Sequence, residues 1–244
     1  MKTYRGTILY TSKHPDRMDA ERGREHFTLT EQPDGLSTLH AHCEIDDAPS
    51  VTRDVLATYH TKTVRPVGAA LRLMVGGRFE GSGTFHFSEA EASCWSRNMR
   101  DGNIQQTIER PDITWFGHHA ITGDGTLGRL IPEGAKPGSK TEVRALMSSP
   151  DHRGATGPML FPLTFSVVFE GDESVTTPAG IFNCRRLSVT DTAGLPEEHP
   201  PYRIWTDRET NIFVRGGVEG YMMTHYALIA LSSTEAPHKE NGHA

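Results

Sequence analysis

Cysteine is scarce in this chain, and the three that occur, Cys43, Cys94 and Cys184, stand far apart in the sequence. No two of them form a C-x-x-C pair, so the sequence predicts neither a disulfide framework nor a zinc site built on cysteine. Long apolar runs are absent as well: the stretch at residues 226–231 is far too short to cross a bilayer. The first residues lead into an amphipathic strand and not into the apolar core of a signal peptide. We therefore expect a cytoplasmic protein without a membrane partner, provided that no leader has been removed.

Basic residues are also in deficit, because 25 Lys and Arg face 31 Asp and Glu, and the formal net charge is −6. This balance excludes a broadly basic surface that would hold the phosphates of a nucleic acid, and no Lys/Arg run restores one. Several catalytic motifs are missing too: there is no G-x-S-x-G nucleophile elbow, no P-loop and no dinucleotide fingerprint after an opening strand. The sequence thus predicts no nucleic-acid partner and no cofactor.

What the chain does have is an alternation of apolar and polar residues with a period of two. In residues 36–45, Leu39, Ala41 and Cys43 share one face, and His40 and His42 share the other. The same alternation or a strand-like run recurs at residues 51–61, 78–87, 163–170, 181–190, 202–207, 211–215 and 222–231. Strands that follow one another without helices between them form antiparallel meanders. A sheet of about a dozen strands cannot stay flat, so it must curl or stack.

Helical signal is confined to two short stretches. Residues 139–142 (Ser-Lys-Thr-Glu) have the spacing of a capping box and precede a short helix-compatible run at 143–147, and residues 16–22 are compatible with a further turn or two. Residues 110–162 are rich in glycine and proline, and a connection of that length commonly serves as a lid or binding loop.

These observations predict an all-β fold with a single antiparallel, lipocalin-like barrel or curled half-barrel and one or two short helices. We expect this domain to span residues 1–232, with the long loop at residues 110–162 covering an opening. Residues 233–244 are expected to form a disordered tail.

The second half of the chain has a recognisable order of motifs. A Pro178-Ala179-Gly180 turn leads into a strand, and residues 202–207 (Tyr-Arg-Ile-Trp-Thr-Asp) and 212–215 (Ile-Phe-Val-Arg) follow as a hairpin. Over residues 163–231 this order resembles a broad group of bacterial proteins of unknown function built on a curled antiparallel sheet, related in shape to lipocalins and to lipoprotein-carrier half-barrels. The resemblance implies the fold and carries no catalytic residues; its envelope members imply a role as a carrier.

Histidine is frequent, with 13 residues in the chain. The pair His118–His119 follows Trp115 in the glycine-rich segment, and imidazoles at a barrel mouth suit general acid–base catalysis because they titrate near neutral pH. The candidate catalytic residues are His118, His119, His60, His40 and His42. The candidate substrate-binding residues are Arg53, Tyr59, His86, Trp115 and His152.

Two interpretations of residues 40–44 stay open. His40, His42 and Glu44 leave the same face of one strand, at a spacing that suits metal ligation. The same face is more often typical of the solvated outer side of an antiparallel strand.

The function predicted first is a cofactor-independent lyase, hydratase or dehydratase, or isomerase. It would use histidine acid–base chemistry on a small apolar, aromatic or terpenoid-like molecule held in the barrel. One alternative is a non-catalytic binder or carrier of a hydrophobic small molecule, and another is a metal-dependent enzyme using His40, His42 and Glu44. Because sheet edges often pair, a homodimer is also expected.

Overall fold

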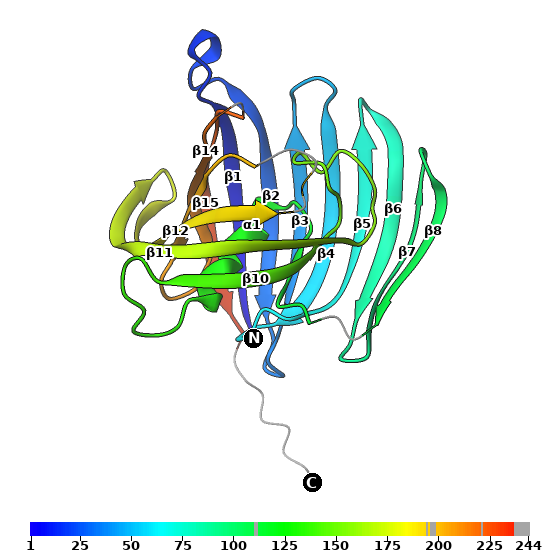
Figure 1. Cartoon of the computed structure of the whole chain (residues 1–244). Coiled ribbons are helices and arrows are strands. Elements are labelled where there is room, and N and C mark those ends of the chain that lie inside the picture. The colour runs from blue at the N-terminus through cyan, green and yellow to red at the C-terminus, as the bar shows by residue number, and fades with distance from the viewer. Residues whose placement is uncertain (110–111, 194, 196–198, 221, 237–244) are drawn as a thin grey trace.

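The computed structural model describes residues 1–109, 112–193, 195, 199–220 and 222–236. Its main feature is a single sheet of 15 strands in the order β8-β7-β6-β5-β4-β3-β2-β1-β15-β14-β13-β12-β11-β10-β9 (Figure 1). The neighbouring strands are antiparallel, apart from β9 and β10, which run parallel. Strands β8 and β9 form the two edges, so the sheet curls without closing.

In chain order the strands are β1 (Lys2–Ser12), β2 (Glu21–Glu31), β3 (Leu36–Ile45), β4 (Val51–His60), β5 (Pro66–Val75), β6 (Arg78–Phe87), β7 (Glu91–Asn98), β8 (Gly102–Glu109), β9 (Trp115–Gly117), β10 (Lys140–Met147), β11 (Phe161–Thr177), β12 (Gly180–Ala193), β13 (Tyr202–Asp207), β14 (Phe213–Val218) and β15 (Thr224–Glu235). The short helices are the 3-10 turn η1 (Pro15–Arg17), the α-helix α1 (Ile121–Asp124) and the 3-10 helix η2 (Gly125–Leu130). No helix in the described part of the chain is long and apolar enough to span a membrane.

The curl brings the two halves of the sheet face to face. Figure 1 shows β1–β8 as a curved wall, with β10, β11 and β12 lying across it and α1 and η2 between the two. One apolar core joins the halves: Ile8 and Leu39 from the first wall and Val143 and Phe165 from the second belong to the same buried cluster. The halves are also joined at the centre of the sheet, where β1 pairs with β15 from Lys2–Glu235 to Ser12–Thr224.

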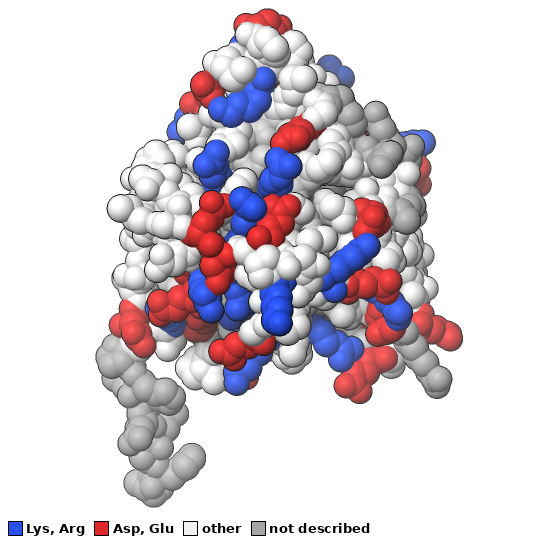
Figure 2. All heavy atoms as spheres, turned by 60° about the vertical axis from the view of Figure 1, so that its left-hand side comes forward, with Lys and Arg blue, Asp and Glu red and all other residues white. Residues whose placement is uncertain are grey.

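The predicted alternation sorts residues to the two sides of the sheet as expected. On β3, Leu39, Ala41 and Cys43 are buried on the inner face, whereas His40 is exposed and His42 half-buried on the outer face. The all-β, antiparallel, barrel-like fold with short helices is thus confirmed. On the face drawn in Figure 2, basic and acidic side chains are interspersed and form no broad patch of one sign.

The segment at residues 110–162 is built differently from the predicted loop. Its described residues contain β9, α1, η2 and β10, and the longest irregular stretches are residues 131–139 and 148–160. The helix predicted from the capping box at residues 139–147 is wrong, because residues 140–147 form β10, which pairs with β11 along its whole length. Val143 and Ala145 of β10 face the core, so tertiary pairing overrides the local helix signal.

The two remaining local predictions differ from the structure in their bounds. The turn predicted at residues 16–22 is the 3-10 turn η1 at residues 15–17, and β2 already begins at Glu21. The predicted tail begins too early, because β15 continues to Glu235, which pairs with Lys2. Residues 237–244 lie outside the described residues.

Candidate functional site

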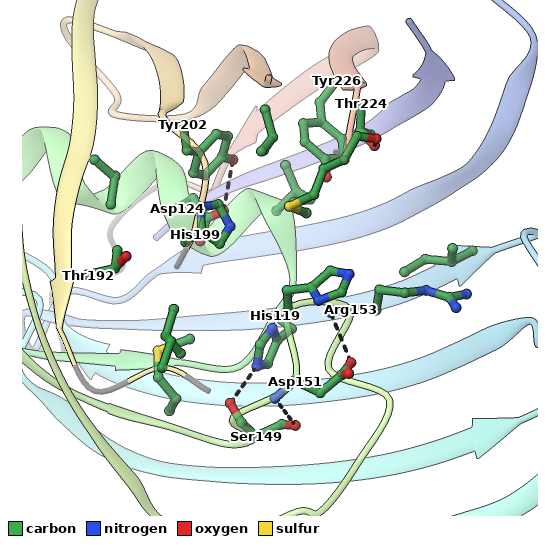
Figure 3. A pocket seen from close by; sticks show the side chains of 18 of the residues that line it. His119, Asp124, Ser149, Asp151, Arg153, Thr192, His199, Tyr202, Thr224 and Tyr226 are labelled. Carbon is green, nitrogen blue, oxygen red and sulfur yellow. Dashed lines mark hydrogen bonds between the residues drawn. The ribbon is translucent and has the colours of Figure 1, made fainter. Parts of the chain in front are cut away.

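Between the two walls lies a cavity of about 280 Å³, close to the lower end of the ~300–1,000 Å³ range of ordinary small-molecule sites. The apolar residues that line it include Ile121, Leu127, Leu163, Phe165, Val189 and Val218. The polar residues that line it include Tyr10, His119, Asp124, Tyr202, Thr224 and Tyr226. Figure 3 shows two polar groups of side chains: Tyr202, Asp124 and His199 on one side, and His119, Ser149 and Asp151 on the other.

Asp124 is the carboxyl group of the first polar group. It ends α1, and its Oδ2 accepts a hydrogen bond from the Tyr202 hydroxyl at 2.9 Å. Burial raises the pKa of Asp124 to about 7; the bond from Tyr202 opposes this rise, and the nearby negative charge of Glu25 adds to it. The ring of Tyr226 packs beside Tyr202 with its centroid 6.3 Å away. The cavity therefore presents a carboxyl group that titrates near neutral pH, beside phenol rings.

Glu25 on β2 fixes the position of this group. It is fully buried, and its carboxylate accepts from the Tyr10 hydroxyl at 2.9 Å and from the main-chain N–H groups of Ile121 and Thr122 at 2.7 and 2.9 Å. The Thr122 hydroxyl and the Cys43 thiol donate to it as well. The first turn of α1 has N–H groups without helical partners, and a carboxylate satisfies them. Glu25 thus ties α1, and with it Asp124, to the first wall.

Arg53 on β4 plays the same part for the opposite side. Its side chain is buried, and its guanidinium donates to the carbonyl oxygens of His119 at 2.9 Å, Arg153 at 2.7 Å and Gly154 at 2.9 Å. Gly154 has a φ of +62°, and a Cβ at this position would lie 2.3 Å from Arg53 Nη2. Arg53, predicted to bind substrate, does line the cavity, but its hydrogen bonds hold the main chain of the wall.

The predicted pair His118–His119 divides between two environments. His119, with a φ of +60°, lines the cavity and donates from Nε2 to the Ser149 carbonyl at 3.2 Å. His118 turns into the core toward Tyr59 and Phe116, and its Nδ1 accepts from the Ala120 N–H at 3.3 Å. Burial, with the charge of Arg53, lowers the pKa of His119 to about 3 and that of His118 to about 4. Both imidazoles are therefore neutral at pH 7.

The strand histidines do not face the cavity. His40, His60 and His86 are exposed on the outer side of the sheet. His42 lies with its Nδ1 2.6 Å from Asp54 Oδ1 and its Nε2 3.5 Å from Glu44, and the bond to Asp54 chiefly raises its pKa. In the described part of the chain no three His, Cys, Asp or Glu side chains form a group that could hold a metal ion, so the structure does not bring His40, His42 and Glu44 together as a set of ligands.

Of the other predicted residues, Trp115 and His152 line the cavity, whereas Tyr59 lies with His118 in the neighbouring core space. The sequence did not point to the buried or half-buried polar residues that lie in or beside the cavity wall, namely Asp124, Tyr202, Tyr226, Tyr10 and Glu25. One signal for Glu25 was present: by the period of two it shares a face with Phe27 and Leu29, so it is a charge on the apolar face of a strand.

Comparisons with known proteins show a similarity in fold alone. No protein-family model and no curated protein matches the sequence. The crystal structure of a β-barrel-like protein of the domain of unknown function DUF1849 from Brucella abortus is similar with a TM-score of 0.61 and 10% sequence identity, over 96% of this chain and 99% of that chain. The hypothetical lipoprotein YmcC from Escherichia coli gives a TM-score of 0.35 and 12% identity, over 94% of this chain and 86% of that chain. The predicted resemblance is thus confirmed for the fold: this chain has the curled, barrel-like sheet of a bacterial protein of unknown function.

Proposed function

We propose that the protein is a cofactor-independent enzyme that moves a proton on a small, mostly apolar molecule bound in the cavity, as a hydratase or dehydratase, another lyase, or an isomerase. The observation that supports this most strongly is the Asp124 carboxyl group in the cavity wall, with a pKa of about 7 and a hydrogen bond from Tyr202. A carboxyl group whose pKa lies near the working pH can both take and give a proton in one catalytic cycle.

In this proposal Asp124 is the general acid and base, in place of the histidines that the sequence predicted. His119 lines the same cavity, but its pKa of about 3 leaves it neutral at pH 7. Its Nε2–H already donates to Ser149, so Nδ1 is the ring atom left to accept a hydrogen bond from a ligand. His119 then orients the substrate, and Asp124 carries the proton.

One observation favours the alternative of a non-catalytic carrier. Much of the wall is apolar, and the buried charges of Glu25 and Arg53 have their hydrogen bonds within the protein. A carrier requires only an apolar volume of suitable shape. The two functions therefore differ in one respect: an enzyme needs the ionisable group of Asp124 and a carrier does not. The cytoplasmic location and the homodimer stay predictions.

The test begins with the ligand, identified by mass spectrometry of extracts from the purified protein. Turnover of that ligand is then compared between the wild type and Asp124→Asn, which keeps the shape of the side chain and loses its proton chemistry. We expect turnover to fall about 10²-fold or more, with the ligand still bound. Glu89→Gln, at an exposed position between β6 and β7, is the matched control and should leave turnover unchanged.

Two outcomes would overturn the proposal. Full turnover by Asp124→Asn would remove Asp124 from the chemistry. A ligand that the wild type binds and returns unchanged across pH 5–9 would favour the carrier.

A further inference from the structure

The charge of the cavity wall is opposite to that of the whole chain. The chain has a net charge of −6, yet four arginines, Arg17, Arg22, Arg53 and Arg153, line the cavity beside two aspartates, Asp124 and Asp151. Arg53 donates its hydrogen bonds to main-chain carbonyl oxygens. The other three arginines come from η1, from β2 and from the segment after β10, and they meet at one end of the cavity.

That end is the mouth of the cavity. Among the residues that line it, Arg17 and His152 are exposed, and the others are buried or half-buried. The side chain of Arg17 is 49% exposed and that of Arg22 only 15%. A ligand that enters the cavity therefore passes a guanidinium group.

Asp47 joins the three guanidinium groups at the mouth, although only Arg17 and Arg22 of the three bond to its carboxylate. It accepts from Arg17 and from Arg22, while Arg153 Nη2 donates to the main-chain oxygens of Asp47 and Pro49, both at 2.8 Å. The Asp151 carboxylate, the other acid nearby, accepts from the N–H groups of Arg153 and Ala155 at 3.0 and 2.8 Å. Counting these three guanidinium groups against the Asp47 and Asp151 carboxylates leaves one net positive charge in this group of side chains.

We propose that the ligand of this cavity is an amphipathic carboxylic acid whose carboxylate lies at the mouth against Arg17 and Arg153, with its apolar body directed inward. A single excess positive charge matches a singly charged anion, and guanidinium groups form strong charge-assisted hydrogen bonds with carboxylates. The inner wall, with Leu127, Leu163 and Phe165, receives an apolar body. This inference rests on the cavity of the proposed function and adds the class of its ligand.

The competing explanation is that the arginines only brace the mouth. Arg22 fits that explanation, since it also donates to Thr224 and to the Met222 carbonyl and so ties β2 to β15 and the residues before it. Arg17 is different: among the described residues its guanidinium bonds to Asp47 alone, and half of its side chain faces solvent. Arg17 is therefore the residue whose replacement separates ligand binding from bracing.

The experiment uses three probes with the same ten-carbon branched chain: geranate, geraniol and geranylamine, which are anionic, neutral and cationic at pH 8. Binding to the full chain is measured by isothermal titration calorimetry for the wild type, Arg17→Gln and Arg153→Gln. The matched control is Arg78→Gln, at an exposed position at the start of β6. Circular dichroism of each variant checks that the fold is kept.

We expect the wild type to bind geranate at least about tenfold more tightly than geraniol, and geranylamine most weakly, because one charge-assisted hydrogen bond is worth about that factor. Arg17→Gln and Arg153→Gln should each weaken geranate about tenfold and change geraniol less than twofold. Arg78→Gln should change neither. Equal weakening of geranate and geraniol would show that the arginines only brace the mouth, and a wild type that binds geranate no better than geraniol would overturn the inference.

Failure of this inference is distinguishable from failure of the proposed function. Asp124→Asn should keep the preference for geranate, because Asp124 lies in the wall on α1 and not at the mouth. A preference for the acid without turnover of the natural ligand would leave the inference standing and remove the enzyme. Turnover of a neutral ligand without any preference for geranate would do the reverse.

Discussion

The Tyr202 hydroxyl donates to Asp124 Oδ2 at 2.9 Å, although the two residues are 78 positions apart in the chain. This bond favours the ionised carboxylate and therefore opposes the effect of burial. Removing it with Tyr202→Phe should raise the pKa of Asp124 further above 7, by about one pH unit for a bond worth ~1.4 kcal/mol. Infrared titration of the protonated carboxyl stretch, with Asp124→Asn identifying the band, measures this directly. Tyr59→Phe, in the neighbouring core space, should leave the band unshifted, and an acid shift in Tyr202→Phe would contradict the assignment.

Asp124 also links stability to pH. Its pKa of about 7 in the folded protein lies above the value of 3.8 that serves as its reference. The folded state thus holds this proton more tightly than the unfolded state, and the resulting stability is complete below about pH 4 and is lost as the pH rises through 7. Asp124→Asn should therefore gain stability relative to the wild type as the pH rises from 5 to 9, by about 3 kcal/mol. Urea unfolding at both pH values provides the measurement, and a difference that does not vary with pH would be inconsistent with a raised pKa.

Replacing Glu25 should loosen α1. Glu25→Gln keeps one acceptor oxygen and places an amide NH2 where the N–H groups of Ile121 and Thr122 point, so at least one buried donor loses its partner. We expect a loss of about 2–4 kcal/mol in the free energy of unfolding. Glu21→Gln on the same strand breaks only an exposed pair with Arg24 and should cost less than about 0.5 kcal/mol. Equal losses in the two variants would refute the anchoring role of Glu25.

Two glycines with a left-handed backbone conformation allow the cost of backbone strain to be separated from the cost of a steric clash when each is replaced by alanine. Gly154 and Gly134 have φ values of +62° and +81°, but a Cβ at Gly154 meets Arg53 Nη2 at 2.3 Å, whereas a Cβ at Gly134 meets nothing within 4 Å. Gly134→Ala should cost about 1 kcal/mol from backbone conformation alone. Gly154→Ala should cost clearly more, about 3 kcal/mol, because Arg53 must shift from its three carbonyl partners. Thermal unfolding of both variants tests the difference, and equal losses would mean that Arg53 adapts freely.

The strands and their inner faces could be predicted because alternation reports which side of a sheet is buried. Cys43 on β3 and Arg53 on β4 both lie on the inner face that the period of two indicates. The error lay in seeking the site on the polar face. His40 and His42 share a polar face because that face meets solvent, whereas the informative residues are polar ones on the apolar face, such as Glu25.

The remaining features depend on distant parts of the chain. Nothing local reports that Asp124 will meet Tyr202, or that a Glu on β2 will bind the first turn of α1. Residues 140–147 show the same limit, since their capping-box spacing was sound as a local signal and was outweighed by pairing with β11. The direction of His118, inward beside Gly123, is likewise set by packing: a Cβ on that glycine would lie 2.3 Å from the His118 ring.

The pairing of β1 with β15 at the centre of the sheet bears on how the chain reaches this fold during synthesis. Residues such as Arg5 and Ser232 meet across 227 positions of sequence, so forming this contact requires closing a very long loop before any pairing offsets the entropy lost. On the ribosome, β2–β8 can assemble early, but β1 keeps one free edge until β15 has been made. A free edge is a template for pairing with other chains, so the nascent protein is expected to depend on chaperones until β15 docks.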